Sequence, residues 1–334
     1  MVSSDQQVQY PCANCGAYVE FAPGTDVLRC PHCGHETSIE RADADVLRHP
    51  YHDFVRRPRR KAIRTGATVV RCPGCGAVTE TTDIALRCPF CAVPMVVEGL
   101  PPQLLVPDAV LPFAVDRDGL AAAVARWSRT RGLRADNDPV FAPNVLKSVT
   151  DVEAWRSVYL PYWVFDARLA PKSMAKRDAQ RFEVAIPAST VVSPEHLTAL
   201  GTWPMAGAQP LRPEYLEGHE AVRYDVEPEP ALEQAQSRMR EQARLQNQWT
   251  EIQVYGPEVA LVLMPVWVTT YLLRGKSYRL YVNGCTGEAS GDHPDSSIKA
   301  WAFVLTVLAV LLGVSVLFVL LGDAWHRFLY GNLP

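Results

Sequence analysis

Apolar and polar residues alternate in several stretches of the chain as half-buried strands require. Residues 103–113 (QLLVPDAVLPF) and 158–169 (VYLPYWVFDARL) have the apolar, β-branched and aromatic composition of strands. Two further strands are predicted at 260–273 and 278–282, joined by a turn at Arg274–Ser277. These stretches predict a sheet.

Two other stretches have the spacing of helices. Residues 119–133 place apolar side chains on one face, and residues 228–249 are rich in Glu, Gln and Arg with sparse apolar positions. The apolar positions are Leu120, Ala123, Val124 and Trp127 in the first helix and Leu232, Ala235, Met239 and Trp249 in the second. Strands and helices together predict a mixed α+β domain.

One short pattern occurs twice in this domain. Tyr159–Val164 (YLPYWV) is echoed by Leu263–Val268 (LMPVWV), and each segment follows a helix and a variable stretch. The repeat predicts a diverged internal duplication of an α+β unit. The alternative interpretation is that Pro-x-Trp suits an edge strand where it enters a sheet.

The C-terminal region is apolar without a polar stripe. Ala300–Leu321 contains 22 uncharged residues, and a helix of that length spans about 33 Å, enough for a bilayer core of about 30 Å. Trp301 lies at the start of this stretch, while Trp325 and Tyr330 follow it, as in an aromatic belt. We therefore expect one transmembrane helix at 298–321; the alternative is an unusually apolar core helix.

Composition and charge narrow the class of protein. The 334 residues are 48% hydrophobic with a formal net charge of −3, which excludes an acidic disordered chain and a globally basic nucleic-acid coat. Met1–Tyr10 shows no signal peptide, so the nine cysteines are expected to be reduced thiols. Thiols need a reducing compartment, and more Lys and Arg precede the span than follow it. We expect a single-pass inner-membrane protein with its N-terminal domains in the cytoplasm and its short tail outside.

Eight cysteines form four Cys-x-x-Cys pairs in two units. The pairs are separated by 14 residues in the first unit and by 12 in the second. Two such knuckles facing each other across a hairpin give a tetrahedral four-thiolate Zn²⁺ site, and a closed shell makes the zinc structural. The predicted ligands are Cys12, Cys15, Cys30 and Cys33 in one site and Cys72, Cys75, Cys88 and Cys91 in the other. Redox pairs, disulfides or an iron–sulfur site are the alternatives. His32 and His35 are expected at the surface, since four thiolates fill the shell.

These features predict a division of the chain into successive parts. The parts are zinc ribbon 1 at 1–45, a basic linker at 46–66, zinc ribbon 2 at 67–99, the α+β domain at 100–297, the transmembrane helix at 298–321 and a tail at 322–334. The linker contains a basic run, 56–64 (RRPRRKAIR). It could contact nucleic-acid phosphates or anionic lipids, or be a solvated linker.

The order of motifs resembles a known family. CPxCG knuckles, LPF before a helix, YLPYWVFDA, YLEGHEAVRYDV, LMPVWVTTYLLRGKSYRLYVNGCTGE and a C-terminal anchor follow one another as in bacterial membrane proteins with a TFIIB-type zinc ribbon. Cys285 stands at the x of VNGxTGE, where the resemblance predicts a polar residue. Some relatives carry a helicase-like name, but this chain has no GxxxxGK[ST] phosphate loop.

The resemblance implies an adaptor role in membrane-stress modules. In them such proteins accompany SPFH (flotillin-like) and phage-shock-protein-A-type membrane-remodelling proteins, so the implied partners are proteins of these two kinds at the lipid bilayer. The sequence has no HExxH, GxSxG or GxGxxG motif, and Cys285 with His293 is better explained as a buried thiol than as a nucleophile pair. We expect a non-enzymatic adaptor or scaffold; the alternative is a membrane-tethered nucleic-acid-binding protein.

Overall fold

The computed structural model describes most of the first 292 residues. The described ranges are 10–40, 46–59, 68–81, 87–97, 105–130, 155–273 and 276–292, together with residues 308 and 310–314. Two compact units divide the chain, Met1–Asp292 and His293–Pro334. All the described strands belong to the first unit.

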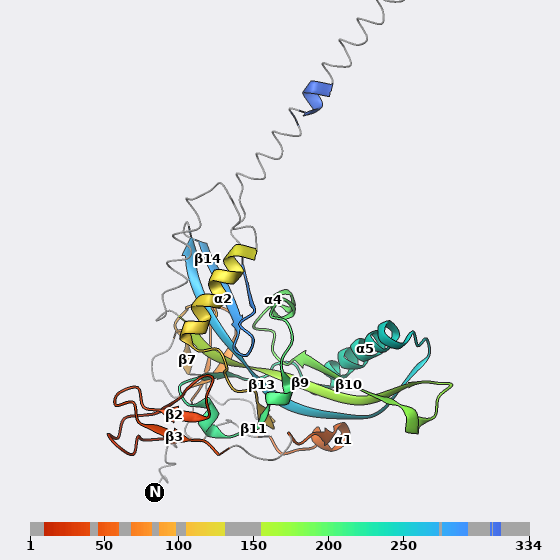
Figure 1. The fold of residues 1–334 in the computed structure, drawn as a ribbon, viewed down its shortest axis with the longest axis horizontal. Coiled ribbons are helices and arrows are strands. Elements are labelled where there is room, and N and C mark those ends of the chain that lie inside the picture. Colours follow the sequence, from red (N-terminus) through yellow and green to blue (C-terminus); the bar gives the residue numbers. More distant parts are fainter. Residues whose placement is uncertain are drawn as a thin grey trace, which may run out of the picture. The chain divides into compact units, whose positions relative to one another are not determined.

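A large mixed sheet organises this unit (Figure 1). Within the described residues it contains 12 strands, and a separate sheet of three strands belongs to the first ribbon. The strands of the small sheet are β1 (Glu20–Phe21), β2 (Val27–Arg29) and β3 (Glu36–Ser38). Those of the large sheet are β4 (His49–Pro50), β5 (Thr68–Arg71), β6 (Val78–Thr81), β7 (Val96–Val97), β8 (Ala109–Val110), β9 (Arg156–Pro171), β10 (Gln180–Pro187), β11 (Gln209–Pro210), β12 (Glu220–Val222), β13 (Ile252–Leu273), β14 (Lys276–Asn283) and β15 (Ala289–Gly291).

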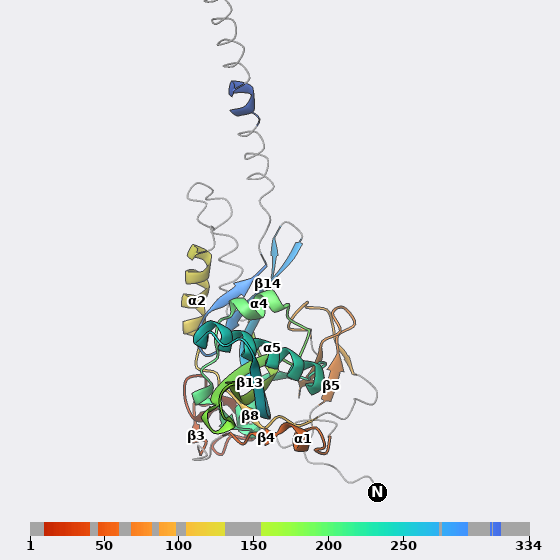
Figure 2. The same ribbon diagram turned by 90° about the vertical axis from the view of Figure 1, so that its right-hand side faces the viewer.

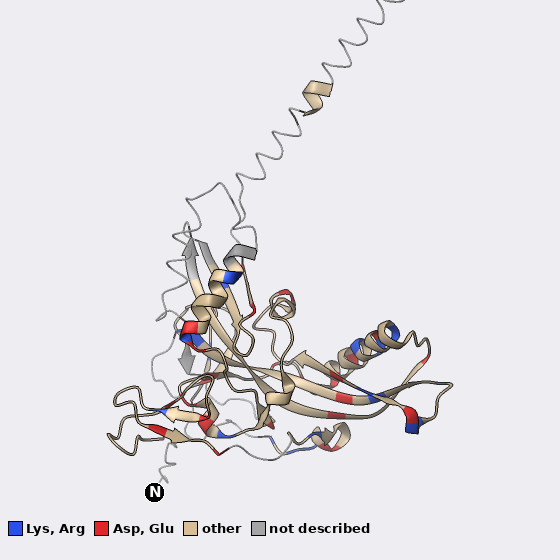
Figure 3. Cartoon of the chain, viewed as in Figure 1, with Lys and Arg blue, Asp and Glu red and all other residues tan. Residues whose placement is uncertain are grey.

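The helices are few and mostly short. The two long ones are α2 (Arg117–Thr130) and α5 (Pro228–Asn247), and the short ones are α1 (Tyr51–Phe54), α4 (Pro194–Ala199) and the 3₁₀ turns η2 (Lys176–Asp178), η3 (Met205–Gly207) and η4 (Pro213–Leu216). α5 begins with prolines in its first turn, where no backbone donor is lost, and ends at Gln248 in the left-handed conformation. Figure 3 shows acidic and basic residues interspersed along it, as the sequence predicts.

Two long antiparallel strands, β9 and β13, form the centre of the sheet. Both repeated hexapeptides lie on this pair, and Leu160 is directly opposite Met264. In each hexapeptide the proline carbonyl accepts a hydrogen bond from the first residue after the neighbouring strand. Ala188 N, just after β10, donates to Pro161 O, and Gly284 N, just after β14, donates to Pro265 O. The sheet tolerates both prolines because each faces the end of its neighbouring strand, where the missing proline N–H breaks no bond between strands.

The contacts of the two tryptophans repeat as well. Trp163 Nε1 donates to Val226 O, two residues before α5 begins, and Trp267 Nε1 donates to Val115 O, two residues before α2 begins. Trp163 packs with α5, and Trp267 packs with α2. Each indole thus fixes the start of one long helix against the sheet.

The same order of elements occurs twice around this centre. The first set is β8, α2, β9 and β10, and the second is β12, α5, β13 and β14. The short strands are exchanged between the sets, because β8 pairs in parallel with β13 and β12 pairs in parallel with β9. The equivalent pairs match in register: Val110 faces Leu263, and Ala221 faces Tyr159.

Both ribbons are attached to this scaffold. Phe21 of the first ribbon donates its N–H to Glu217 O and packs edge-on against Tyr215, with ring centroids 5.4 Å apart. The second ribbon joins the large sheet, where β6 pairs antiparallel with β12 through Thr79 and Val222. Figure 2 labels β5, the strand of this ribbon that pairs with β6 in the large sheet.

Most of the predicted elements agree with the described ones apart from their ends, but the predicted strand at 103–113 is largely wrong, because among its described residues only Ala109–Val110 (β8) pair in the sheet. The predicted strands at 158–169, 260–273 and 278–282 lie within β9, β13 and β14, and the predicted helices overlap α2 and α5. The α+β class of the middle domain is confirmed.

The predicted transmembrane helix at 298–321 lies largely outside the described residues. Residues 310–314 are helical, and Leu312 and Val314 are exposed. Among the described residues, no helix has the length and apolar character needed to cross a membrane.

Candidate metal centres

Four tight knuckles position the eight cysteines. In each knuckle the first cysteine donates its N–H to the carbonyl five residues later, and its own carbonyl accepts from the N–H four residues later. The four donors to the cysteine carbonyls are Gly16, Gly34, Gly76 and Ala92. The repeated pattern means that each Cys-x-x-Cys pair has the same backbone turn, which brings its two sulfurs together.

The knuckles meet in pairs to form two four-sulfur clusters. In each cluster the four Sγ atoms lie within 4.8 Å of one another. Across the two hairpins, Cys12 is 3.6 Å from Cys33 and Cys72 is 3.3 Å from Cys91. These separations are far longer than a disulfide of about 2.0 Å and close to the edge of about 3.8 Å that zinc bonds of about 2.3 Å give a tetrahedron. The donor sets fit Zn²⁺, and the chain has two structural zinc sites.

Backbone dipoles favour the thiolate form at two of these sulfurs. The backbone N–H of His35 lowers the pKa of Cys33 to about 6. Burial opposes ionisation of Cys72, but the backbone N–H of Cys75, the neighbouring Cys91 thiol and the backbone N–H of Gly74 together bring its pKa to about 7. Gly74 N lies 3.3 Å from this sulfur. Thiolates are the form that binds zinc, so these amides favour metal binding at Cys33 and Cys72, whereas burial raises the pKa of Cys75 and Cys88 in the second cluster.

Both clusters are built to be closed. The first cysteine of every knuckle is buried, at Cys12, Cys30, Cys72 and Cys88, and four sulfurs complete a tetrahedral shell without a position for water. His32 and His35 are exposed and belong to neither cluster, as the sequence predicts. The zinc ions would stabilise the ribbons rather than activate a substrate.

The fourth knuckle differs from the others in one residue. Gly16, Gly34 and Gly76 have φ near +75° (76°, 73° and 77°), whereas the equivalent residue in the second ribbon is Ala92, with φ 60°. A non-glycine residue pays a steric cost in this conformation. The zinc site and the hydrogen bond from Ala92 N to Cys88 O hold the turn in place.

Two described arginines of the basic run form ion pairs within the protein. Arg57 Nη1 contacts Asp108 Oδ1, and Arg59 Nη2 lies 3.2 Å from Glu227 Oε2. Asp108 is buried, and its other oxygen accepts the N–H of Leu261 on β13. These two arginines fasten the linker to the sheet. Residues 60–64 of the run lie outside the described residues.

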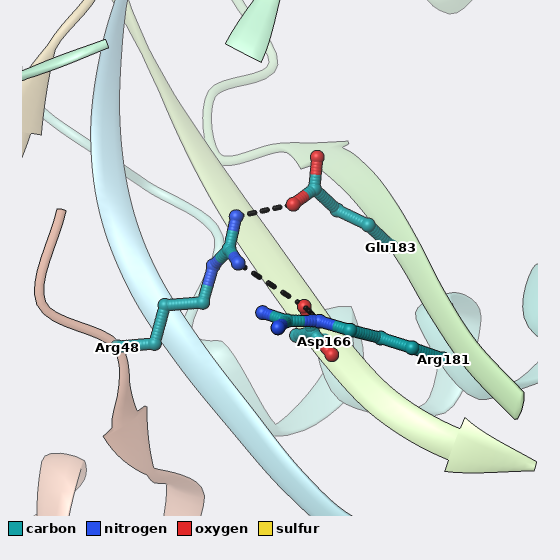
Figure 4. A network of polar contacts seen from close by, with 4 residues as sticks. All are labelled: Arg48, Asp166, Arg181 and Glu183. Atoms are coloured by element: carbon teal, nitrogen blue, oxygen red, sulfur yellow. Dashed lines mark hydrogen bonds and ion pairs between the residues drawn. The ribbon is translucent and has the colours of Figure 1, made fainter. Parts of the chain in front are cut away.

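A second ion-pair network lies where the linker enters the sheet (Figure 4). Arg48 reaches between two carboxylates, with Nη1 3.1 Å from Asp166 Oδ2 and Nη2 in contact with Glu183. Arg181 Nε lies 2.5 Å from the same Asp166 oxygen. The Asp166 carboxylate is buried, so the two guanidinium groups supply the charge that its burial requires.

Sequence reasoning missed one cluster with chemistry-bearing side chains. His196 on α4 has Nδ1 3.0 Å from Ser290 Oγ and Nε2 3.1 Å from Asp292 Oδ1. Only the folded sheet brings these residues together, because His196 lies more than 90 positions from both partners in the sequence. Ser290 is 2% exposed within β15, so the cluster ties α4 to the end of the sheet instead of presenting a nucleophile.

Comparisons with known proteins agree with the metal sites. Residues 5–36 match a zinc-ribbon family described as the 7 kDa subunit of DNA-directed RNA polymerase. The chain is also similar to the uncharacterised protein YdjG of Bacillus subtilis, with 22% identity covering 88% of this chain and 93% of that protein. No solved structure matches. The N-terminal zinc ribbon is therefore shown by both sequence family and geometry.

Proposed function

We propose that this chain is a membrane-anchored zinc-ribbon adaptor. It recruits protein partners of the SPFH (flotillin-like) or phage-shock-protein-A type to the inner membrane in envelope maintenance or stress. The C-terminal segment at 298–321 is its anchor, and the N-terminal domains face the cytoplasm. The resemblance of the chain to bacterial zinc-ribbon membrane proteins supplies the partner classes and the compartment.

One observation carries the adaptor role. Both metal centres are closed four-thiolate shells, and both ribbons are attached to the sheet-containing unit, the first through the hydrogen bond from Phe21 N to Glu217 O and the second through the pairing of β6 with β12. A closed shell cannot bind or activate a substrate at the metal. Such a ribbon can present a fixed surface to another protein, and attachment to a large sheet lowers the entropy lost on docking.

Partner capture from gently solubilised membranes tests this proposal. Tagged full-length protein should co-purify SPFH or membrane-remodelling proteins without nucleic acid, as judged by mass spectrometry and nuclease treatment. Cys72→Ser with Cys75→Ser should abolish capture while the protein stays in the membrane fraction. A chain lacking residues 298–334 should leave that fraction. Capture of neither class by the wild-type protein would reject the proposal.

The alternative is a membrane-tethered nucleic-acid-binding protein. It is favoured by the family matched at residues 5–36, whose description names an RNA polymerase subunit. Against it, Arg57 and Arg59 already bind carboxylates of this chain. Nucleic-acid binding would weaken steeply with salt, since neutralised phosphates release counterions, and would be lost when Arg56, Arg57, Arg59 and Arg60 are replaced by Ser.

We also propose that the two sets of elements arose by internal duplication. The matched hexapeptides, the two indole bonds and the two short parallel strands support this origin. Relatives of this chain should then show self-similarity between the two sets. Relatives in which only one set has the Pro-x-Trp pattern and the indole bond would contradict it.

A further inference from the structure

A groove of about 570 Å³ runs along the outer edge of β10. Its floor is residues 183–185 with Pro187, and Tyr162 of β9 lies beneath. The lining residues come from α4 and the loop after it on one side and from α5 on the other, and Figure 1 labels both helices. The wall residues are Pro194, Leu197, Thr198, Gly201, Thr202, Trp203 and Met205 on one side and Arg238 and Gln242 on the other.

The backbone of β10 has unused bonding positions along this groove. Ala188 N donates to Pro161 O, so the even-numbered residues of β10 bond to β9. Antiparallel strands alternate the direction of their backbone groups, so those of Glu183 and Ala185 point away from β9. No described strand pairs with this side of β10. The edge can therefore accept a further strand.

The equivalent edge in the second set of elements already carries a strand. β14 corresponds to β10, and β15 pairs antiparallel with it at Leu280–Val282. Tyr281 of β14 lies opposite Ser290, and in the matched registers it corresponds to Ala185 of β10. The pairing of β15 with β14 therefore shows, within the same chain, how a short strand pairs with the outer edge of such a strand.

Two polar groups at the groove define the chemistry of an occupant. Tyr162 is 3% exposed, its ring centroid lies 5.8 Å from that of the Trp203 ring, and the Trp203 indole favours its hydroxyl as an acceptor, while no described residue accepts the hydroxyl proton. Burial raises the pKa of Tyr162, so the hydroxyl remains a donor. Arg238 adds a cation, whereas Glu183 already pairs with Arg48. A buried donor and a nearby cation favour a carboxylate.

We propose that the outer edge of β10 binds an extended segment of a partner protein as an added strand, in the antiparallel arrangement that β15 adopts on β14, with a carboxylate of that segment held by Arg238 and Tyr162. This inference rests on the proposed adaptor function and adds to the ribbon surface a second site of contact with the partner. Backbone hydrogen bonds to β10 would give the partner segment affinity that depends little on its sequence. The contact of its carboxylate with Arg238 and Tyr162 would make binding selective for segments that carry one.

The test uses the full-length, zinc-loaded protein in detergent micelles. The probe is a synthetic library of eight-residue peptides, each made with a free carboxyl end and with an amidated end, and the best binder is followed by fluorescence polarisation. Loss of binding on amidation assigns the carboxylate to the peptide end. Loss on Asp→Asn or Glu→Gln replacement in the peptide assigns it to a side chain.

Three variants of the protein examine the separate contacts. Tyr162→Phe removes only the hydroxyl and should weaken binding about five- to tenfold, and Arg238→Gln should weaken it about tenfold or more. Ala185→Pro removes an outward N–H without breaking a bond to β9, and it should weaken binding about tenfold. Arg244→Gln, on the same helix but outside the groove, is the matched control and should bind like the wild type.

Two results would overturn the inference. One is that no library peptide binds more tightly than about 1 mM; the other is that Tyr162→Phe and Arg238→Gln leave affinity unchanged. Methylation of peptide nitrogens gives a control that does not depend on folding of Ala185→Pro, since it should block alternate bonds to β10. If Arg238→Gln retains partner capture while the cysteine variants lose it, the adaptor function stands and the groove assignment is wrong.

Discussion

Arg223 and Glu80 form a buried ion pair between the central sheet and the second ribbon. Arg223 Nη1 contacts Glu80 Oε1, and the two side chains are 3% and 0% exposed. Arg223 N also donates to Val78 O, so backbone and side chain both cross the junction. The second ribbon is thus fixed to the sheet through charges that water does not reach.

Breaking this pair from one side should be strongly destabilising. Glu80→Gln or Arg223→Met leaves a buried charge without its partner, and we expect a loss of about 3–5 kcal/mol in the free energy of unfolding. Replacing both, as Glu80→Leu with Arg223→Met, should restore most of that loss. Urea unfolding measures all three; a double variant no better than the singles would show that the pair contributes more than charge neutralisation.

Each ribbon should hold one zinc ion independently of the other. Wild-type protein is expected to contain two zinc ions per chain, and Cys12→Ser or Cys88→Ser to contain one. Because metal binding supplies much of a small ribbon's folding energy, chelation should lower the thermal midpoint. Elemental analysis checks the stoichiometry. Two ions retained in Cys12→Ser would mean that the first cluster tolerates three thiolates.

Ala92→Gly should stabilise the second ribbon by about 1 kcal/mol, because glycine adopts positive φ without the steric cost that alanine pays. Ala92 has φ 60°, and the three equivalent knuckle residues are glycines. The reverse change, Gly76→Ala, should destabilise by a similar amount, since an added Cβ meets no atom within 4 Å and only the backbone is strained. Zinc affinity and thermal unfolding report both effects.

Cys285 should make the protein less stable at alkaline pH. Burial raises the pKa of this thiol from 9.0 to about 12. Between these values the unfolded chain loses the proton while the folded chain keeps it, so stability falls as pH rises above about 9. The wild type should therefore lose more stability than Cys285→Ala between pH 8 and pH 10.5, as measured by urea unfolding. Equal losses of stability in the wild type and in Cys285→Ala would mean that the Cys285 thiol is in contact with water in the folded protein.

The cysteine spacing made the metal sites predictable from sequence because each knuckle is a local structure. All eight predicted ligands lie in the two clusters. The Pro-x-Trp repeat likewise indicated two equivalent strands, since the motif is short and each copy acts within one strand. What the indoles bind could not be predicted, because Val226 and Val115 belong to distant segments.

The missed features depend on long-range pairing. β13 begins at Ile252, eight residues before its predicted start, because the stretch from Ile252 through Glu258 pairs with β9 across a register shift after Tyr255. The pairing of the second ribbon with β12 joins Thr79 to Val222, and no local pattern marks that contact. The groove at β10 was missed for the same reason, since its walls come from separate elements.

The exchange of β8 and β12 has a consequence for synthesis of the chain. β8 emerges from the ribosome long before its neighbour, Val262–Leu263 of β13, and β9 must wait for Ala221 and then for β13. The first set of elements cannot close by itself, and such non-local pairing slows folding. β10 can pair with one edge of β9 soon after it is made, but translation leaves β8 and the other edge of β9 without their β13 partner until nearly the whole first unit has been made.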